Sequence, residues 1–296
     1  MQAVTEIEIS GLPVFARGKV RTAYDLGARL LVVATDRISA FDYVLPTGIP
    51  DKGKILTATS AYWFRALEHV SKHHMISTDP SDFPPEAARY TDLLRHRTML
   101  VRKARRIDLE CIVRGFLSGS AWKDYEATGK VAGHALPEGL AAGARLERPL
   151  FTPSTKSSEG HDRNITIDEM DLMLGADVAG QIAERSLSLF EEARRIADAK
   201  GIMIVDTKFE FGWIDSEICL IDEIFTPDSS RFLARIAGSS RPINLDKQFV
   251  RDYLESVGWD KQPPAPGLPA EIVAEARRRY LSVLESLTGE TPSWAR

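Results

Sequence analysis

Acidic and basic residues alternate along one stretch of the chain in a pattern suited to binding a metal-bound nucleotide. Ile202–Val205 is an uninterrupted apolar run after Gly201, which is typical of a buried strand that follows the end of a helix. Successive side chains of a strand point to opposite faces, so Asp206, Lys208 and Glu210 fall on one face. This face therefore presents carboxylates beside an ammonium group.

Another carboxylate follows on the return strand of the expected hairpin. Gly212–Ser216 supplies turn residues, and Glu217–Ile224 is interpreted as the return strand, with Asp222 near its end. Mg²⁺ binds a few carboxylate oxygens together with phosphate oxygens, and an ammonium offsets phosphate charge. The two strands therefore predict a metal–nucleotide site. A solvated hairpin face is the alternative, although the apolar run Ile218–Ile221 favours a buried strand.

Two stretches have the composition of anion-binding loops. Pro227–Arg231 combines turn residues with hydroxyls and an arginine that can bind an anion in bidentate fashion. The expected strand Leu109–Val113 leads into Arg114–Ser120, RGFLSGS, whose backbone amides and hydroxyls can hold a phosphate. An ordinary strand-to-helix loop also uses Gly and Ser and is the alternative. The basic stretch Arg102–Arg106 is either a nucleotide contact or a solvated bend, and its pattern favours the bend.

The N-terminal part contains a possible flap over phosphates. Gly18 lies between two short strand-like segments, and alternation places Lys19 and Arg21 on one face. The alternative is a surface hairpin whose basic residues face solvent and have no binding role. The polar stretch Asp36–Asp42 directly follows an apolar strand, where binding loops concentrate. A helix is expected over Ile55–Val70 from its apolar spacing.

The remaining segments are read as scaffold and loops. His69 and His73 are four residues apart without a metal motif, and we interpret them as surface residues. The polar stretch from 150 to 164 is either a disordered linker or a substrate-capturing loop with Lys156 and Asp162. Asp177–Lys200 has the pattern of a long amphipathic helix that packs behind the hairpin. Shorter helices are expected over 246–254 and 271–287.

Composition excludes several classes of protein. The chain has 296 residues with 44% hydrophobic content, enough for one large or two modest domains. A net charge of −4 argues against a nucleic-acid-binding protein. Cys111 and Cys219 lie in apolar runs without metal-ligand spacing, so we expect buried, reduced thiols. No run of 18 apolar residues occurs, and we expect a cytoplasmic protein without membrane contact.

These stretches together resemble the SAICAR synthetase (phosphoribosylaminoimidazole-succinocarboxamide synthase) family, in its longer, yeast-like form. The resemblance runs in order from about residue 11 to 256. Thr22 and Leu233 depart from the usual family residues, which are an acid and an aromatic. The blocks that carry it are GKVR (18–21), TDRISAFD (35–42), IPDKGKILT (49–57), ECIVRGFLSGSAWKDY (110–125), FTPSTKSSEGHDRNI (151–165), IVDTKFEFG (204–212), DEIFTPDSSR (222–231) and LDKQFVRDYL (245–254).

The resemblance implies an α+β, two-lobed fold related to the nucleotide-binding lobes of protein kinases and ATP-grasp enzymes. Residues 1–107 would form a β-rich ATP-binding lobe and residues 108–296 an α/β lobe with the metal and substrate sites. Family members use ATP and Mg²⁺ to join L-aspartate to the carboxylate of carboxyaminoimidazole ribonucleotide (CAIR), through an acyl phosphate, in de novo purine synthesis. The protein would be a monomer or small homo-oligomer.

The resemblance also implies roles for individual residues. Lys208 and Asp206 would face the reacting carboxylate and the incoming aspartate, and Glu210 and Asp222 would hold Mg²⁺. The implied ATP contacts are Gly18, Lys19, Val20, Lys103 and Glu110, and the implied substrate contacts are Arg114, Ser120, Ser230, Arg231, Ser39 and Lys156, the last two on the aspartate side. A small-molecule phosphotransferase and a non-catalytic nucleotide sensor remain the competing functions.

Overall fold

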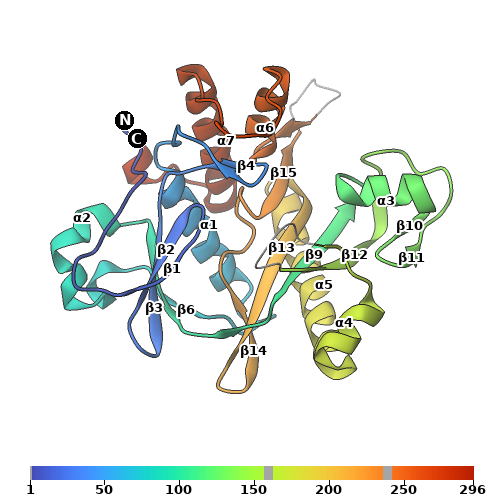
Figure 1. Ribbon diagram of the computed structural model, residues 1–296, viewed down its shortest axis with the longest axis horizontal. Coiled ribbons are helices and arrows are strands. Elements are labelled where there is room, and N and C mark those ends of the chain that lie inside the picture. Colours follow the sequence, from blue (N-terminus) through green and yellow to red (C-terminus); the bar gives the residue numbers. More distant parts are fainter. Residues whose placement is uncertain (1, 157–162, 236–241) are drawn as a thin grey trace.

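Two antiparallel sheets form the centre of the α+β fold (Figure 1). The computed structural model describes residues 2–156, 163–235 and 242–296. The first sheet has five strands in the order β1-β2-β3-β7-β6. All of its strands come from the first part of the chain: β1 (Val14–Arg17), β2 (Arg21–Asp25), β3 (Arg29–Ala34), β6 (Met75–Ser77) and β7 (Thr98–Arg102).

The second sheet has seven strands arranged around the long strand β13 (Ile202–Ile214). Its main path is β12-β9-β13-β15-β16, and β14 and β8 also pair with β13. The other strands are β8 (Arg105–Arg106), β9 (Leu109–Phe116), β12 (Arg145–Thr155), β14 (Glu217–Ile221), β15 (Ser230–Ala234) and β16 (Ile243–Asn244). Two small hairpins complete the strands: β4 (Ser39–Ala40) with β5 (Tyr43–Val44), and β10 (Lys130–Val131) with β11 (His134–Ala135).

Helices cover the second sheet and join it to the first part of the chain. The α-helices are α1 (Lys52–Ala66), α2 (Thr91–Leu94), α3 (Ser120–Thr128), α4 (Ile167–Leu174), α5 (Ala176–Ala199), α6 (Gln248–Ser256) and α7 (Ala270–Thr288), with short 3-10 helices at Pro80–Asp82, Pro85–Tyr90 and Ser293–Ala295. The amphipathic helix α5 packs on β13 through a buried stripe that includes Ile182, Leu189 and Phe190. This confirms the predicted long helix behind the hairpin.

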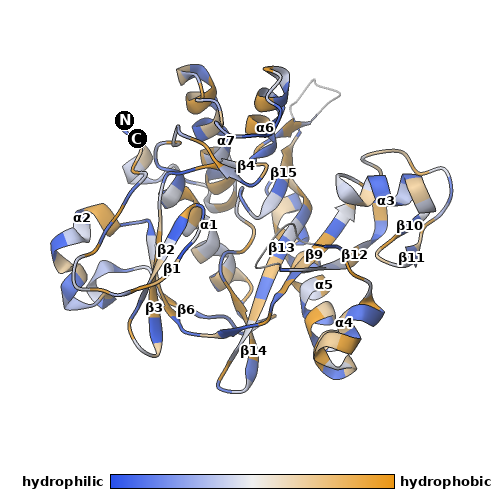
Figure 2. Ribbon diagram, in the orientation of Figure 1, coloured by the Kyte–Doolittle hydropathy of each residue, from blue (hydrophilic) through white to orange (hydrophobic). Residues whose placement is uncertain are grey.

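The alternation predicted along β13 is present and divides the strand into two chemical faces. Figure 2 shows hydrophilic and hydrophobic residues alternating after the apolar start of the strand. Phe209 and Phe211 are buried in the main hydrophobic core, while Lys208 and Glu210 line a cavity on the opposite side. Both cysteines are also buried and unpaired, as predicted.

The predicted position of the hairpin turn was wrong. β13 continues through Gly212 to Ile214, and the turn consists of Asp215 and Ser216, whose φ angles are 50° and 64°. Positive φ at both central residues matches the right-handed twist of a two-residue hairpin. Gly212 serves a different purpose, because a Cβ there would lie 3.1 Å from the carbonyl oxygen of Arg105 on the neighbouring strand β8.

Two other expectations are corrected. Residues 151–155, taken as part of a polar linker or loop, are the end of β12 and pair with β9. Asp162, named with that loop, lies outside the described residues. His69 and His73, interpreted as surface residues, both follow the end of α1 at Ala66. His73 is also partly buried, with its ring centroid 4.9 Å from that of Phe64, whereas His69 is exposed as expected.

The C-terminal helices share a hydrophobic core with an early part of the chain. Ile38, Ile49 and Ile55 are buried together with Val250 of α6 and Tyr280 of α7. The division into lobes at residue 107 remains our proposal. β8, on the N-terminal side of that boundary, pairs with β13 of the second sheet, and α6 and α7 pack on residues 38–56.

Candidate functional site

Two adjoining cavities lie between the first sheet and β13. The flap cavity, of about 740 Å³, is lined by the β1–β2 turn around Gly18 and by Glu210. The arginine cavity, of about 690 Å³, is lined by Arg114 and Arg231. Every residue in the predicted site except Lys103 lines one or both cavities. Their shared wall consists of Lys19, Val20, Asp42, Glu110, Lys208 and Asp222.

The flap cavity joins an apolar slot to a basic turn. Apolar side chains from the first sheet and β14 line the slot, namely Val20, Ala23, Leu30, Val32, Val101 and Ile221. The backbone N–H of Gly18 donates to the carbonyl oxygen of Arg21 at 2.8 Å, which closes the turn. The ammonium of Lys19 donates to Asp42 at 2.5 Å at the exposed mouth. An apolar slot with a basic lip can hold a flat aromatic ring attached to a polyanion.

Glu210 and Asp222 bring two carboxylates to one wall of the flap cavity. Glu210 is paired with Ile221 on β14, and Asp222 follows directly after that strand. Burial and the nearby Asp222 charge raise the pKa of Glu210 above its ordinary value. Burial also opposes ionisation of Asp222, but the charges of Arg21, Lys156 and Lys208 lower its pKa overall. The two carboxylates therefore lie close enough to affect each other's ionisation, and neighbouring cations offset their charge.

The composition of this pair fits Mg²⁺ rather than a metal held by protein ligands alone. Among the described residues, no group of three or more His, Cys, Asp and Glu side chains is arranged to hold a metal ion. Mg²⁺ usually takes one or two protein carboxylates and completes its coordination with phosphate and water oxygens. Lys156, which donates to Glu210, and Arg21, with Nη1 3.4 Å from Asp222 Oδ1, balance the two carboxylates in this structure.

Lys208 projects from β13 into the shared wall. Its Nζ donates to Glu110, which lies on the neighbouring strand β9. Burial by itself would lower the pKa of Lys208. The charges of Glu110 and Glu210 outweigh this effect, so the pKa lies above its ordinary value. Lys208 is therefore a protonated cation held between the two cavities.

Asp206 lies between two arginines because of the register of three strands. On β13 it is paired with Arg114 of β9 on one side and Arg231 of β15 on the other. The Nε of Arg231 donates to Asp206 Oδ1 at 2.9 Å, and Arg114 Nη1 is 3.9 Å from Asp206 Oδ2. Arg114 also donates to Ser120 Oγ at 3.0 Å and to Thr152 Oγ1 at 3.1 Å. Both guanidinium groups are thus held in the wall of the arginine cavity, where they could bind an anion.

The N-terminus of α3 faces the same cavity. Gly119 precedes the helix with φ 61° and ψ −132°, and no side chain in the described part of the chain caps the first turn. Gly119 and Ser120 both line the arginine cavity, so the unpaired backbone amides of a helix start lie near the two guanidinium groups. Ser230, on β15, shares a hydrogen bond of 2.7 Å with Thr207 Oγ1.

The structure places some predicted residues differently from their implied roles. Lys103 lines neither cavity, because its Nζ donates to Asp25 at 2.8 Å and lies 4.6 Å from the ring centroid of Phe15. Lys156 lies beside Glu210 in the flap cavity and not with Ser39, which lines the arginine cavity. Ser39 and Lys156, both implied to contact aspartate, are therefore in different cavities.

Several lining residues were not assigned by sequence reasoning. The side chain of Asp228 is only 4% exposed and accepts hydrogen bonds from Lys52 Nζ at 2.6 Å and the Tyr280 hydroxyl at 2.8 Å. Lys247 Nζ lies 3.8 Å from the same carboxylate. Lys52 and Lys247 belong to the blocks IPDKGKILT and LDKQFVRDYL, which supported the resemblance without receiving roles. His74, which also lines the flap cavity, lies in no such block.

Comparison with known proteins identifies the family of the chain. The SAICAR synthetase family matches residues 14–266. The chain belongs to this family. It is 51% identical over 291 residues to the phosphoribosylaminoimidazole-succinocarboxamide synthase of Geotalea uraniireducens, covering 97% of this chain and 98% of the relative. The corresponding protein of Thermodesulfovibrio yellowstonii is 49% identical over 287 residues, covering 96% and 98%.

Solved structures of the family have the same fold. The SAICAR synthase of Saccharomyces cerevisiae in complex with SAICAR superposes with a TM-score of 0.88 at 39% identity, covering 98% of this chain and 99% of that one. A SAICAR synthetase in complex with ADP gives a TM-score of 0.70 at 26% identity, covering 95% and 100%. The agreement with the yeast enzyme confirms the longer, yeast-like form.

Within the described residues, no helix is both long and apolar enough to cross a membrane.

Proposed function

We propose that the flap cavity binds ATP and the arginine cavity binds the ribonucleotide in the SAICAR synthase reaction of purine biosynthesis. The activity itself follows from near-full-length identity to phosphoribosylaminoimidazole-succinocarboxamide synthases. The observation that carries the assignment of sites is the shared wall, where Lys208, Glu110 and Asp222 face both cavities. A phosphoryl group must pass between nucleotide and substrate, and this wall is where the two would meet.

The nucleotide would enter with its base in the apolar slot and its phosphates toward the carboxylate pair. The β1–β2 turn, including Gly18, Lys19 and Val20, covers the cavity from above and contributes a cation. Glu210 and Asp222 would hold Mg²⁺, which would supply positive charge to offset that of the phosphates. Lys156 and Arg21, which balance these carboxylates here, would turn toward the phosphates.

The ribonucleotide would be held by the groups around Asp206. Arg114, Arg231 and Ser120 offer donors to a phosphate or carboxylate, and the start of α3 adds backbone amides. Asp206 keeps both guanidinium groups in the cavity before the anion arrives, which lowers the entropy lost on binding. Ser230 adds a hydroxyl on the same strand as Arg231.

Catalysis would consist mainly of positioning and charge neutralisation. A carboxylate is a poor electrophile, so transfer of the terminal phosphoryl group of ATP to a carboxylate oxygen of CAIR gives ADP and an acyl phosphate. The amine of L-aspartate then attacks the acyl carbon, the carbon–oxygen bond to phosphate breaks, and the amine loses a proton. Protonated Lys208 would offset charge on the transferring group, and Asp206 and Ser39 face the cavity where aspartate arrives.

The test is ADP release with CAIR present, measured with and without L-aspartate. We expect sustained ADP release and formation of SAICAR only when CAIR, L-aspartate, ATP and Mg²⁺ are all present. Sustained ADP release that is indifferent to aspartate would favour the phosphotransferase reading. ATP binding without any turnover would favour the nucleotide sensor. Omitting Mg²⁺, or replacing it by Na⁺ at equal ionic strength, separates the metal requirement from a general salt effect.

A further inference from the structure

The backbone of Asp222 adopts a conformation that its surroundings must maintain. β14 ends at Ile221, and Asp222 then has φ 61°, in the left-handed region that L-residues with a Cβ seldom occupy. This turn directs the chain away from β13 exactly where a carboxylate faces Glu210 in the flap cavity. Such residues persist only when neighbouring groups hold them in place. The group that holds the Asp222 backbone in this conformation therefore also affects where its carboxylate lies.

His74 contacts the backbone of Asp222 directly. Its Nε2 lies 3.1 Å from the Asp222 carbonyl oxygen, and His74 also lines the flap cavity. A carbonyl oxygen can only accept a hydrogen bond, so Nε2 must carry the proton. His74 is only 5% exposed, so this hydrogen bond is shielded from water.

The backbone of His74 is itself fixed to the edge of β14. The N–H of His74 donates to the Leu220 carbonyl at 3.0 Å, and the N–H of Leu220 donates to the Lys72 carbonyl at 2.9 Å. His73 forms a parallel bridge with Leu220 between these two bonds. Residues 72–74 therefore form a short added strand whose last side chain reaches past Ile221 to Asp222.

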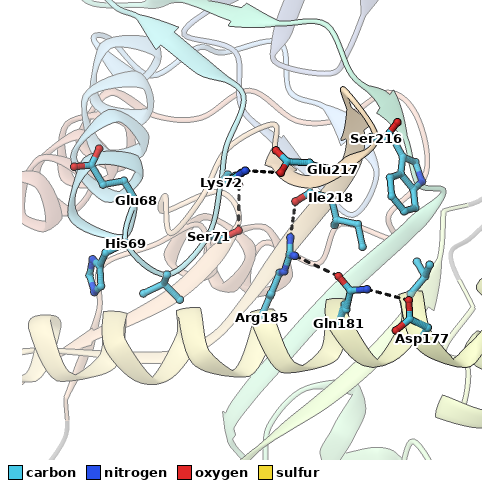
Figure 3. Close-up of a pocket in the computed structure, with 13 residues that line it drawn as sticks. Glu68, His69, Ser71, Lys72, Asp177, Gln181, Arg185, Ser216, Glu217 and Ile218 are labelled. Atoms are coloured by element: carbon cyan, nitrogen blue, oxygen red, sulfur yellow. Dashed lines mark hydrogen bonds and ion pairs between the residues drawn. The ribbon is translucent and has the colours of Figure 1, made fainter.

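The opposite end of β14 is tied down from a different direction. Figure 3 shows Arg185 of α5 reaching the carbonyl oxygen of Ile218, at 2.5 Å, and Lys72 paired with Glu217. These contacts lie around a cavity that shares no lining residue with the flap or arginine cavity. The start of β14 is thus held by α5, its middle by residues 72–74, and its end by the His74 ring.

We propose that His74 is a positioning residue for Mg²⁺ binding, because its Nε2–H holds the Asp222 carbonyl and keeps the carboxylate turned toward Glu210. The inference rests on the assignment of Asp222 to Mg²⁺ under the proposed function. His74 itself touches neither metal nor reacting atoms in this scheme. Groups that orient a metal ligand in this way commonly change metal affinity by about 10- to 100-fold when they are removed.

The experiment compares a variant that loses the donor with one that keeps it. His74→Phe retains a flat ring beside Phe64, 5.5 Å away between centroids, but has no N–H. His74→Gln retains a side-chain N–H at a similar reach. The readout is ADP affinity by calorimetry over a series of Mg²⁺ concentrations. The measured quantity is the Mg²⁺ concentration that gives half of the increase in ADP affinity. We expect this concentration to rise roughly tenfold or more in His74→Phe and to stay within about threefold of wild type in His74→Gln.

His73→Phe is the matched control. His73 is the adjacent residue, its Nδ1 has no hydrogen-bond partner among the residues that the structure describes, and it lines neither functional cavity. We expect it to have the Mg²⁺ requirement of wild type. Thermal unfolding without Mg²⁺ or nucleotide checks that each variant is folded. If His74→Phe does not fold, His74→Leu removes the donor while keeping apolar volume, and the same comparison with His74→Gln applies.

Two results would overturn the proposal. One is an unchanged Mg²⁺ requirement in folded His74→Phe or His74→Leu. The other is an equal loss in His74→Gln, which would mean that the ring and not its donor matters. Asp222→Asn, measured in parallel, separates this failure from that of the metal assignment. If Asp222→Asn needs the same Mg²⁺ concentration as wild type, the metal site is elsewhere. If Asp222→Asn weakens the effect of Mg²⁺ on ADP affinity while the His74 variants behave as wild type, only the role of His74 is refuted.

Discussion

At the scale of single residues, the site is a set of opposite charges held at short range before any substrate is present. Asp206 balances Arg114 and Arg231, Lys208 is paired with Glu110, and Glu210 accepts from Lys156. Each pairing keeps a charged side chain in the cavity, because an unpaired buried charge is strongly disfavoured. An incoming anion or cation then replaces one of these partners, and no flexible side chain has to be ordered on binding.

Replacement of Asp222 tests the carboxylate pair. Asp222→Asn keeps the size of the side chain but removes the charge assigned to Mg²⁺, and Arg21 retains Glu223 as a partner. We expect turnover at saturating substrates to fall roughly a hundredfold or more, as removal of a key electrostatic group does. Initial rates of SAICAR formation measure the effect, and the unfolding temperature should stay within a few degrees of wild type.

The control for Asp222→Asn is Asp215→Asn in the turn of the same hairpin. Asp215 is exposed, and its carboxylate lies 3.9 Å from Arg102 Nη1. We expect this variant to be as active as wild type. Activity of Asp222→Asn within a few-fold of wild type would show that the metal assignment is wrong.

Sequence reasoning reached the residues of β13 because strand alternation is a local property. It correctly grouped Lys208 and Glu210 on one face, opposite buried Phe209 and Phe211. It did not foresee the direction of the Lys103 side chain, which donates to Asp25. That direction depends on β2, which is distant in the sequence, so the residues around Lys103 carry no sign of it.

At the scale of elements, strand registers and helix starts decide what each cavity contains. The start of α3 enters the arginine cavity because Gly119 has φ 61° and ψ −132°, a combination open almost only to glycine. A Cβ at this position would also lie 3.3 Å from both terminal nitrogens of Arg231. Gly119 therefore sets both the direction of α3 and the space for the guanidinium group.

Gly119→Ala is expected to weaken ribonucleotide binding. The strained backbone costs on the order of 1–3 kcal/mol, and the added methyl group displaces Arg231. We expect the KM for CAIR to rise about tenfold while the KM for ATP is little changed, as steady-state kinetics would measure. Gly129→Ala at the other end of α3 is the control, because Gly129 also has positive φ but no neighbour near a Cβ. It should lower stability by about 1 kcal/mol without changing the KM for CAIR.

A buried carboxyl links β15 to the start of α6. Asp246 accepts hydrogen bonds of 2.7 Å from the backbone N–H groups of Phe232 and Gln248. Burial raises the pKa of its carboxyl to about 6, against the lowering effect of these bonds and with a smaller upward contribution from Asp206. The folded state therefore binds a proton more tightly than the unfolded chain does between about pH 4 and pH 6.

The stability that Asp246 contributes should fall as the pH rises through this window. Because the folded-state pKa is the higher one, protonation favours folding, and the benefit is lost by about pH 6. We expect the unfolding free energy of wild type minus that of Asp246→Asn to decrease by up to about 3 kcal/mol between pH 4 and pH 7. Urea unfolding of both proteins at each pH gives this difference. A difference that grows with pH would contradict the raised pKa.

Elements were predicted well where the signal is local and poorly where pairing is long-range. The amphipathic pattern of α5 and its stop at Gly201 are local, and both were correct. The end of β12 was missed because Thr152, Pro153 and Ser154 read as a polar loop, yet the segment is buried by pairing with β9. Gly212 was wrongly assigned to a turn. This position requires a glycine because β8 approaches closely, and the neighbouring residues give no sign of that approach.

At the scale of the whole molecule, one buried charge cluster joins three distant parts of the chain. Asp228 belongs to the loop before β15, Lys52 begins α1, and Tyr280 lies in α7. Lys52 and Tyr280 are fully buried. The cluster therefore connects the wall of the arginine cavity to the helices that cover it. The blocks around Lys52 and Asp228 were recognised in the sequence, but their meeting depends on the complete fold.

Removal of Lys52 should destabilise the whole protein. Lys52→Met leaves the buried Asp228 carboxylate without its closest cation, and loss of one partner of a buried pair typically costs about 3–5 kcal/mol. Urea unfolding measures the change. Lys72→Met is the matched control, because the Lys72–Glu217 pair is 61% and 52% exposed, and such surface pairs contribute about 1 kcal/mol or less. Equal effects of the two substitutions would show that the buried cluster does not hold the fold together.

The core shared by α1, α6 and α7 also governs the order of events during translation. Ile38, Ile49 and Ile55 leave the ribosome well before Val250 and Tyr280, the partners that cover them, have been synthesised. Until then the apolar side of α1 lacks these partners, and exposed apolar surface of this kind favours aggregation of an incomplete chain. A premature stop codon ahead of α7 would make this exposure permanent, so truncated products should be cleared by proteases and not accumulate as partly active enzyme.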